Sequence, residues 1–170
     1  QEFFMINPET NMPFGMVLSP RRKSSCLFVN VIVGIIKHLF GSTNRYVGVE
    51  GEQGPYYCGV GASKVAGRDV VSDHMIKCMN AGLDITGTNA EVALGQWEYQ
   101  VLGAGIKAGD DMWMSRYILQ KIAEKHGVVI NFAPKPQKGD WNGSGMHTHQ
   151  SLWKGDKALF AGNKYAGLSD

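Results

Sequence analysis

The interpretation of this chain depends on one stretch, Gly87-Thr-Asn-Ala-Glu-Val-Ala-Leu-Gly-Gln-Trp-Glu-Tyr-Gln-Val101. It holds two short β-prone stretches joined around Leu94-Gly95, a pattern typical of a β-hairpin. A turn centred there predicts that Glu91 stands directly opposite Glu98, with side chains about 4.5–5.5 Å apart. If the turn shifts by one residue, the two carboxylates point to opposite faces and are ordinary solvated charges.

The hairpin register has a chemical consequence for these two acids. Like charges directly across a strand ladder are destabilising unless one carboxyl is protonated or a cation lies between them. Hard divalent cations prefer oxygen ligands of this kind. The register that brings Glu91 and Glu98 together therefore predicts a metal site.

The segments on either side of the hairpin are expected to be helical. A helix is predicted over 69–81, capped by Asp69 and ended by Gly82, with an apolar stripe of Val71, Met75, Cys78 and Met79. A second helix begins at Asp110 or Asp111 and ends at Gly127, with a stripe of Met114, Tyr117, Ile118 and Ile122. A strand over Val128–Phe132 follows. This order of elements indicates the α+β class.

Composition narrows the classes of function. The chain has 170 residues, 44% of them apolar and 19% charged, so we expect one folded domain. Its net charge of +2 is too small for a nucleic-acid footprint, and we expect no nucleic-acid partner. The longest apolar run, 26–40, is too short and too interrupted to span a bilayer. Three cysteines without a CxxC pair favour a reducing, cytoplasmic setting.

A second group of candidate site residues lies at Asn142–Ser151, where glycine and histidine are interleaved. His147 and His149 would point the same way on a strand. Neutral imidazole can ligate a metal, and protonated imidazole can contact phosphate. Histidines are also common on plain surface strands, so this pattern alone leaves both interpretations open.

The segment 17–51 differs from the rest of the chain, because no acidic residue occurs between Glu9 and Glu50. We interpret 17–51 either as an insertion or as the translation of a non-coding stretch. The first and last residues carry no start or stop pattern, and we expect the chain to be a fragment of a longer protein.

Several motifs resemble the glutamine synthetase family in order and spacing. They are GPYYCGVGA (54–62), GTNAEV (87–92), GQWEYQV (95–101), PKP (134–136), DWNGSGMH (140–147) and HQSLW (149–153). A weaker match covers 2–15. Residues 52–143 look like the type II form, whereas HTHQSLW and the final YAGLSD look like the type I form, and 17–51 has no counterpart in either.

The resemblance implies part of a glutamine synthetase catalytic domain, with an antiparallel curved sheet and flanking helices. It implies ATP-dependent ligation of ammonia to glutamate through γ-glutamyl phosphate, with Mg²⁺ or Mn²⁺. By position Glu2, Glu91 and Glu98 resemble the carboxylates of one metal site and His147 the imidazole of a second. Glu91 also resembles the catalytic acid beside the incoming ammonia. Asn142 and Gly143 resemble glutamate-binding residues, and His149 and Ser151 resemble ATP-binding residues.

The family's N-terminal β-grasp domain and the C-terminal part of its catalytic domain have no match here. We therefore expect this stretch alone to be inactive, and the complete protein to be a double-ringed homo-oligomer. Two alternatives stay open. One is a catalytically silent relative with a structural or regulatory role, and the other is a related ligase that joins an amine to a different carboxylate.

Overall fold

The computed structural model describes residues 1–15, 53–136 and 141–170. A five-stranded antiparallel sheet has the order β2-β1-β4-β3, with β5 also paired to β1. Its strands are β1 (Glu2–Asn7), β2 (Met12–Pro13), β3 (Ile85–Ala90), β4 (Gln96–Val101) and β5 (Val129–Asn131). The proposed insertion over 17–51 lies outside the described residues.

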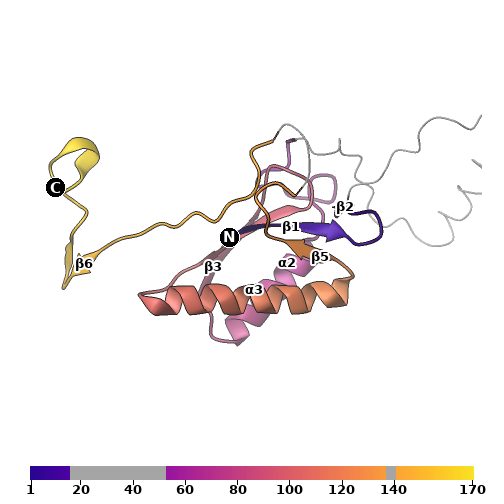
Figure 1. Ribbon diagram of the computed structural model, residues 1–170, viewed down its shortest axis with the longest axis horizontal. Coiled ribbons are helices and arrows are strands. Elements are labelled where there is room, and N and C mark those ends of the chain that lie inside the picture. The colour runs from indigo at the N-terminus through magenta and orange to yellow at the C-terminus, as the bar shows by residue number, and fades with distance from the viewer. Residues whose placement is uncertain (16–52, 137–140) are drawn as a thin grey trace, which may run out of the picture.

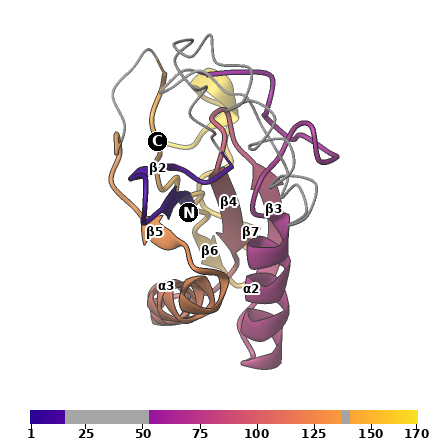
Figure 2. The same ribbon diagram turned by 90° about the vertical axis from the view of Figure 1, so that its right-hand side faces the viewer.

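Two helices cover one face of this sheet. They are α2 (Arg68–Asn80) and α3 (Ile106–His126), whose axes cross at a steep angle beneath the strands (Figures 1 and 2). Phe3 and Met5 of β1 and Trp97 and Tyr99 of β4 point toward the helices and form the main core with them. Because side chains alternate along a strand, Glu2 and Glu98 point to the opposite face. That opposite face carries the carboxylates beside a second, smaller apolar cluster of Phe4, Ile6, Ala93 and Trp141.

The hairpin forms, but in a different register from the predicted one. β3 pairs with β4 so that Asn89, not Glu91, faces Glu98. The Glu91 N–H donates to the Gln96 carbonyl over 3.0 Å, and Gly95 adopts a φ of +77° in the turn. The register differs from the prediction by two residues, so the loop is longer. A shift of two keeps Glu91 and Glu98 on the predicted common face, although a bulge between Ile85 and Gly87 changes the register at the far end of the hairpin.

The first predicted helix is confirmed within one residue of its bounds, but its cap and stripe are wrong in part. Its N-cap is Gly67, and Asp69 makes no capping hydrogen bond. The buried face is Val70, Val71, His74 and Cys78. Met79 is exposed, because the histidine rather than a methionine packs against the sheet, with its ring edge-on to Tyr99 at 4.7 Å.

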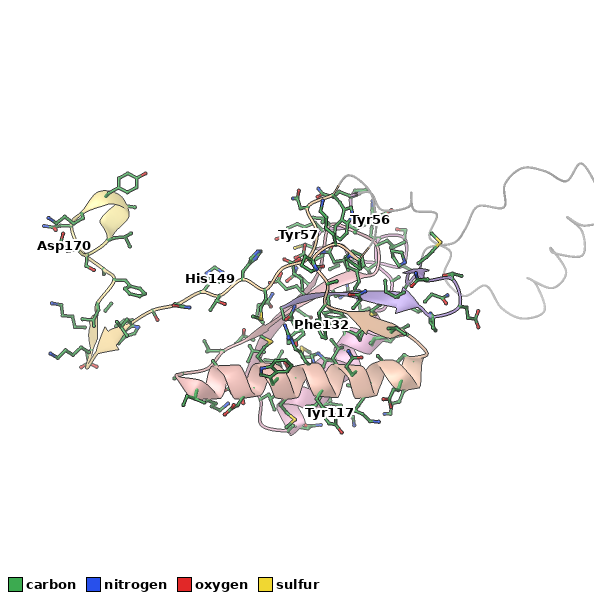
Figure 3. All side chains as sticks on the ribbon, in the orientation of Figure 1. Tyr56, Tyr57, Tyr117, Phe132, His149 and Asp170 are labelled. Atoms are coloured by element: carbon green, nitrogen blue, oxygen red, sulfur yellow. The ribbon has the colours of Figure 1, made fainter. Side chains whose placement is uncertain are left out.

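The second predicted helix ends at Gly127 as expected and begins earlier, with Gly105 as its N-cap. Its buried residues are Ser115, Leu119, Ile122 and Ala123, whereas Met114 and Tyr117 are exposed. Figure 3 shows Tyr117 on the outer side of α3. The buried face is rotated relative to the predicted one because it includes Ser115. The Ser115 hydroxyl makes hydrogen bonds with the Tyr99 hydroxyl at 2.9 Å and the Met112 carbonyl at 2.7 Å, so it can be buried.

The end of the chain leaves the body of the fold. After residue 145 the backbone extends away from the sheet to a small hairpin, β6 (Trp153–Lys154) and β7 (Lys157–Ala158), and a short 3₁₀ turn, η1 (Tyr165–Gly167) (Figure 1). Side chains from 146 onward are exposed or half-buried. Among the residues that the structure describes, no helix has the length and apolarity needed to cross a bilayer.

Candidate functional site

Three carboxylates converge on the sheet face that the helices leave free. Glu2 begins β1 and pairs directly with Glu98 in β4, while Glu91 follows the last residue of β3. One carboxylate oxygen from each lies within 4.8 Å of the others. Glu2 and Glu91 are only 8% and 7% exposed, so water screens their charges poorly.

The electrostatics of this cluster favour one retained proton. Burial, the hydrogen bond with Glu98 and the charge of Glu2 together raise the pKa of Glu91 to about 7. Burial opposes ionisation of Glu98, but hydrogen bonds from Glu91, Asn89 and Gln100 outweigh it and lower the pKa of Glu98. A cluster of three carboxyl groups in which Glu91 holds a proton up to about neutral pH fits a divalent cation, which would replace that proton.

A loop forms the other wall of the site. The Glu2 N–H donates to the Gly145 carbonyl at 2.9 Å, and the Gly145 N–H donates to Glu2 Oε2 at 3.0 Å. The Ser144 N–H donates to the Pro134 carbonyl at 2.7 Å. Gly143 has a φ of +92°, and a Cβ there would lie 2.5 Å from the Pro134 oxygen, so only glycine fits. These bonds fix 143–145 against the start of β1.

His147 follows this loop. Its Nδ1 lies 3.9 Å from Glu2 Oε1, and its side chain is 74% exposed. Glu2 therefore has one oxygen held by the Gly145 amide and the other turned toward an imidazole. The histidine and the carboxylates can contact one ligand.

Together the strands and the loop enclose a cleft of about 460 Å³. Six of the eight residues singled out in the sequence line it: Glu2, Glu91, Glu98, Asn142, Gly143 and His147. The Asn142 N–H is held by Gln53 Oε1 at 2.5 Å. The cleft is lined by carboxylates on one side and by a glycine-rich backbone on the other.

His149 and Ser151 are not brought to this cleft. His149 lies along the extended segment between the body and the terminal hairpin (Figure 3). The Ser151 hydroxyl accepts a hydrogen bond from Trp153 Nε1 at 3.0 Å. Both side chains are exposed.

The site also contains residues that were not predicted from the sequence. Tyr57 lines the cleft, Asn89 Nδ2 donates to Glu91 Oε1 at 3.0 Å, and the Gln96 side chain reaches Glu2 Oε2 at 3.0 Å. The signal was the alternation in Gln96-Trp97-Glu98-Tyr99-Gln100, which puts one polar and one apolar face on β4. The polar face belongs to the site.

The fold and the cleft together define an α+β domain with a carboxylate-lined site on the open face of its antiparallel sheet. The family model for the glutamine synthetase catalytic domain matches residues 2–170. The chain belongs to the glutamine synthetase family.

Curated relatives support this membership. The chain is 60% identical over 104 residues to glutamine synthetase 1, mitochondrial, of Drosophila melanogaster, covering 61% of this chain and 26% of that protein. It is 59% identical over 105 residues to glutamine synthetase PR-1 of Phaseolus vulgaris and 57% identical over 105 residues to a cytosolic isozyme of Vitis vinifera. Each of these covers 61% of this chain and 30% of the relative. The chain thus spans less than a third of their length.

The fold is also that of a solved structure. A ligand-free GmaS structure aligns with a TM-score of 0.59 and 22% sequence identity, over 99% of this chain and 32% of that one. This likeness supports the α+β fold with its antiparallel sheet.

Proposed function

We propose that this chain supplies the cation-binding and glutamate-binding walls of a glutamine synthetase active site. In the proposed reaction ATP phosphorylates the γ-carboxylate of glutamate, and ammonia then displaces phosphate to give glutamine. The observation that carries the proposal is the single cleft that gathers Glu2, Glu91, Glu98, Asn142, Gly143 and His147. Membership in the family supplies the reaction class.

The carboxylates of Glu2, Glu91 and Glu98 are the proposed holders of Mg²⁺ or Mn²⁺, and His147 is the proposed imidazole of a second cation. When bound, the cation neutralises the negative charge that gathers as a phosphoryl group approaches a carboxylate. The Gly145 amide keeps Glu2 in its orientation, so its free oxygen stays turned toward the cleft.

Glu91 is the proposed proton acceptor. Its carboxylate lines the cleft, where it would attract ammonium and take a proton from it. The Asn89 amide holds its Oε1, so the carboxyl is oriented rather than free to rotate. Asn142 and Gly143 are the proposed contacts for the amino-acid end of glutamate, because exposed loop amides suit a carboxylate.

ATP binding by His149 and Ser151 is proposed on the resemblance alone, since these residues lie outside the cleft. Assembly into a homo-oligomer and a cytoplasmic location are likewise proposed. The relatives include both cytosolic isozymes and a mitochondrial protein. Because the ATP-side residues stand apart from the carboxylates, we expect the chain alone to bind ligands without turnover.

The proposal is tested by adding L-glutamate to the ¹⁵N-labelled chain in the presence of Mg²⁺. We expect amide resonances of Asn142 and Gly143 to shift on addition of L-glutamate, more with Mg²⁺ than without it. L-aspartate, one methylene shorter, serves as the control and should shift them less. A larger response to another acid would favour the related ligase, and no metal-dependent response to any acid would favour the silent relative.

A further inference from the structure

A single buried side chain joins the two walls of the cleft. Gln96, the first residue of β4, is 1% exposed. Its Nε2 lies 3.0 Å from Glu2 Oε2, 3.0 Å from the Gly143 carbonyl oxygen and 3.1 Å from Ser144 Oγ. Its Oε1 accepts from the Ala93 N–H at 3.2 Å. One amide therefore touches the β1 carboxylate, the loop and the hairpin turn.

These contacts use the whole hydrogen-bonding capacity of the amide. An NH₂ group has two hydrogens, and here three acceptors from two segments lie within reach of it. The oxygen is held by the turn that carries Glu91, so the amide cannot flip without losing that bond. A buried polar group tied at both ends fixes its neighbours more firmly than a solvated one does.

We propose that Gln96 is a positioning residue that couples the cation-binding carboxylates to the loop 143–145. This rests on the proposed function, which assigns cation and acid to the two walls. Glu2 Oε2 has two donors, Gln96 Nε2 and the Gly145 N–H, and both come from groups that also hold the loop. When Glu2 is fixed by a ligand, the loop is fixed with it, and the converse also holds.

Gln96 differs from a metal ligand, because the hydrogen bonds of its side-chain amide are made to other groups of the protein. Its loss leaves Glu2 with a single donor and leaves the Gly143 carbonyl without its partner from β4. Partners that orient metal ligands typically change metal affinity by about 10–100-fold when they are removed. We therefore expect Gln96 to act on metal affinity through Glu2 and on loop order through Gly143.

The test compares the wild-type chain with Gln96→Met, which keeps the volume of the side chain and removes its hydrogen bonds. The matched control is Gln120→Met, because Gln120 is exposed on α3. Hydrogen exchange without metal reports the loop through the Gly145 amide, which donates to Glu2. The Val128 amide, bonded to the Ala123 carbonyl at the end of α3, reports global stability.

We expect Gln96→Met to speed exchange at Gly145 at least about tenfold more than at Val128, and to weaken Mn²⁺ binding about tenfold. A purely structural role would speed both amides equally. Equal acceleration, or unchanged Mn²⁺ affinity in a variant whose loop has loosened, would overturn the proposal.

If Gln96→Met does not fold, Ser144→Ala and Gln96→Glu replace it. Gln96→Glu keeps an acceptor for Ala93 and has at most one O–H donor in place of two amide hydrogens, so it should loosen Gly145, whereas Ser144→Ala leaves Glu2 and Gly143 bonded and should not. The opposite order contradicts the coupling. Failure of the proposed function has a different signature: the wild-type chain does not bind Mn²⁺, while the exchange difference at Gly145 persists.

Discussion

Glu2 and Glu98 stand directly opposite each other in the antiparallel pairing of β1 and β4, at the point where Glu91 leaves β3. Strand β1 and the distant β3–β4 hairpin thus bring three carboxylates to the same place on the sheet. The repulsion among these carboxylates is unfavourable in the absence of a cation. Because the pKa of Glu91 is raised to about 7, the metal-free cluster reduces the repulsion by keeping a proton at Glu91.

The Glu91 carboxyl should lower the stability of the metal-free chain as pH rises from about 5 to 7, whereas His74, whose pKa is lowered by burial, acts in the opposite direction. The pKa of Glu91 is raised from 4.5 to about 7 in the folded state, so the folded state binds more protons than the unfolded state across this window. Protonation therefore stabilises the fold at the low end, and the benefit is lost as pH passes the folded pKa. Urea unfolding at fixed ionic strength from pH 5 to 8 measures it.

Glu91→Gln is the variant that isolates this effect, because a neutral amide replaces the titrating carboxyl. The difference in unfolding free energy between the wild-type chain and this variant should change over the same window, because the contribution of His74 is common to both proteins. The lowered pKa of Glu98 acts below its usual range and does not mask the result. An unchanged slope in Glu91→Gln would remove Glu91 as its source.

The hairpin pattern predicted the shared face of Glu91 and Glu98 but not the register of the strands. Glu91 and Glu98 share a face because the observed register differs from the predicted one by two residues, and an even shift preserves the face. The position of Glu2 beside them could not be derived from the local sequence pattern. The pairing of β1 with β4 joins distant parts of the chain and depends on packing in the core. Only the resemblance to the family supplied it.

The helix bounds were predictable because glycines mark them, as at Gly127. The buried faces were less so, since Ser115 and His74 are polar by type but buried by packing. A pattern that assigns only apolar residues to the core counts both as exposed. The predicted buried face of each helix is therefore rotated from the observed one. Gln96 was not predicted as a site residue, because its partners lie in β1 and in 143–144, far from it in the sequence.

Replacing Gly143 by alanine should destabilise the chain by more than the usual cost of a left-handed alanine. Its φ is +92°, and the added Cβ would lie 2.5 Å from the Pro134 oxygen, so the loop must move. Gly155→Ala is the control, because Gly155 has a φ of +59° and nothing within 4 Å. We expect a loss of about 2 kcal/mol or more at Gly143 and about 1 kcal/mol at Gly155 in urea unfolding. Equal losses would mean that the loop does not press on Pro134.

The two cysteines within the described ranges should differ sharply in reactivity. Cys78 is fully buried beside His74, with its Sγ 3.1 Å from His74 Nε2, and burial raises the pKa of its thiol to about 11. Cys58 is exposed. Because the thiolate is the nucleophile, iodoacetamide at pH 7.5 should label Cys58 and spare Cys78 until the chain is unfolded. Peptide mass spectrometry reads out both sites, and early labelling of Cys78 would contradict the packing of α2 against the sheet.

The central claim, that the carboxylate cluster is a cation site, is tested most directly by calorimetric titration of the chain with Mn²⁺. Glu98→Gln removes one charged ligand from the cluster, and Glu9→Gln makes the same change at an exposed position in the turn after β1. The account predicts that Glu9→Gln binds Mn²⁺ as the wild-type chain does, while Glu98→Gln binds it at least about tenfold more weakly. Equal affinity in all three proteins would contradict it.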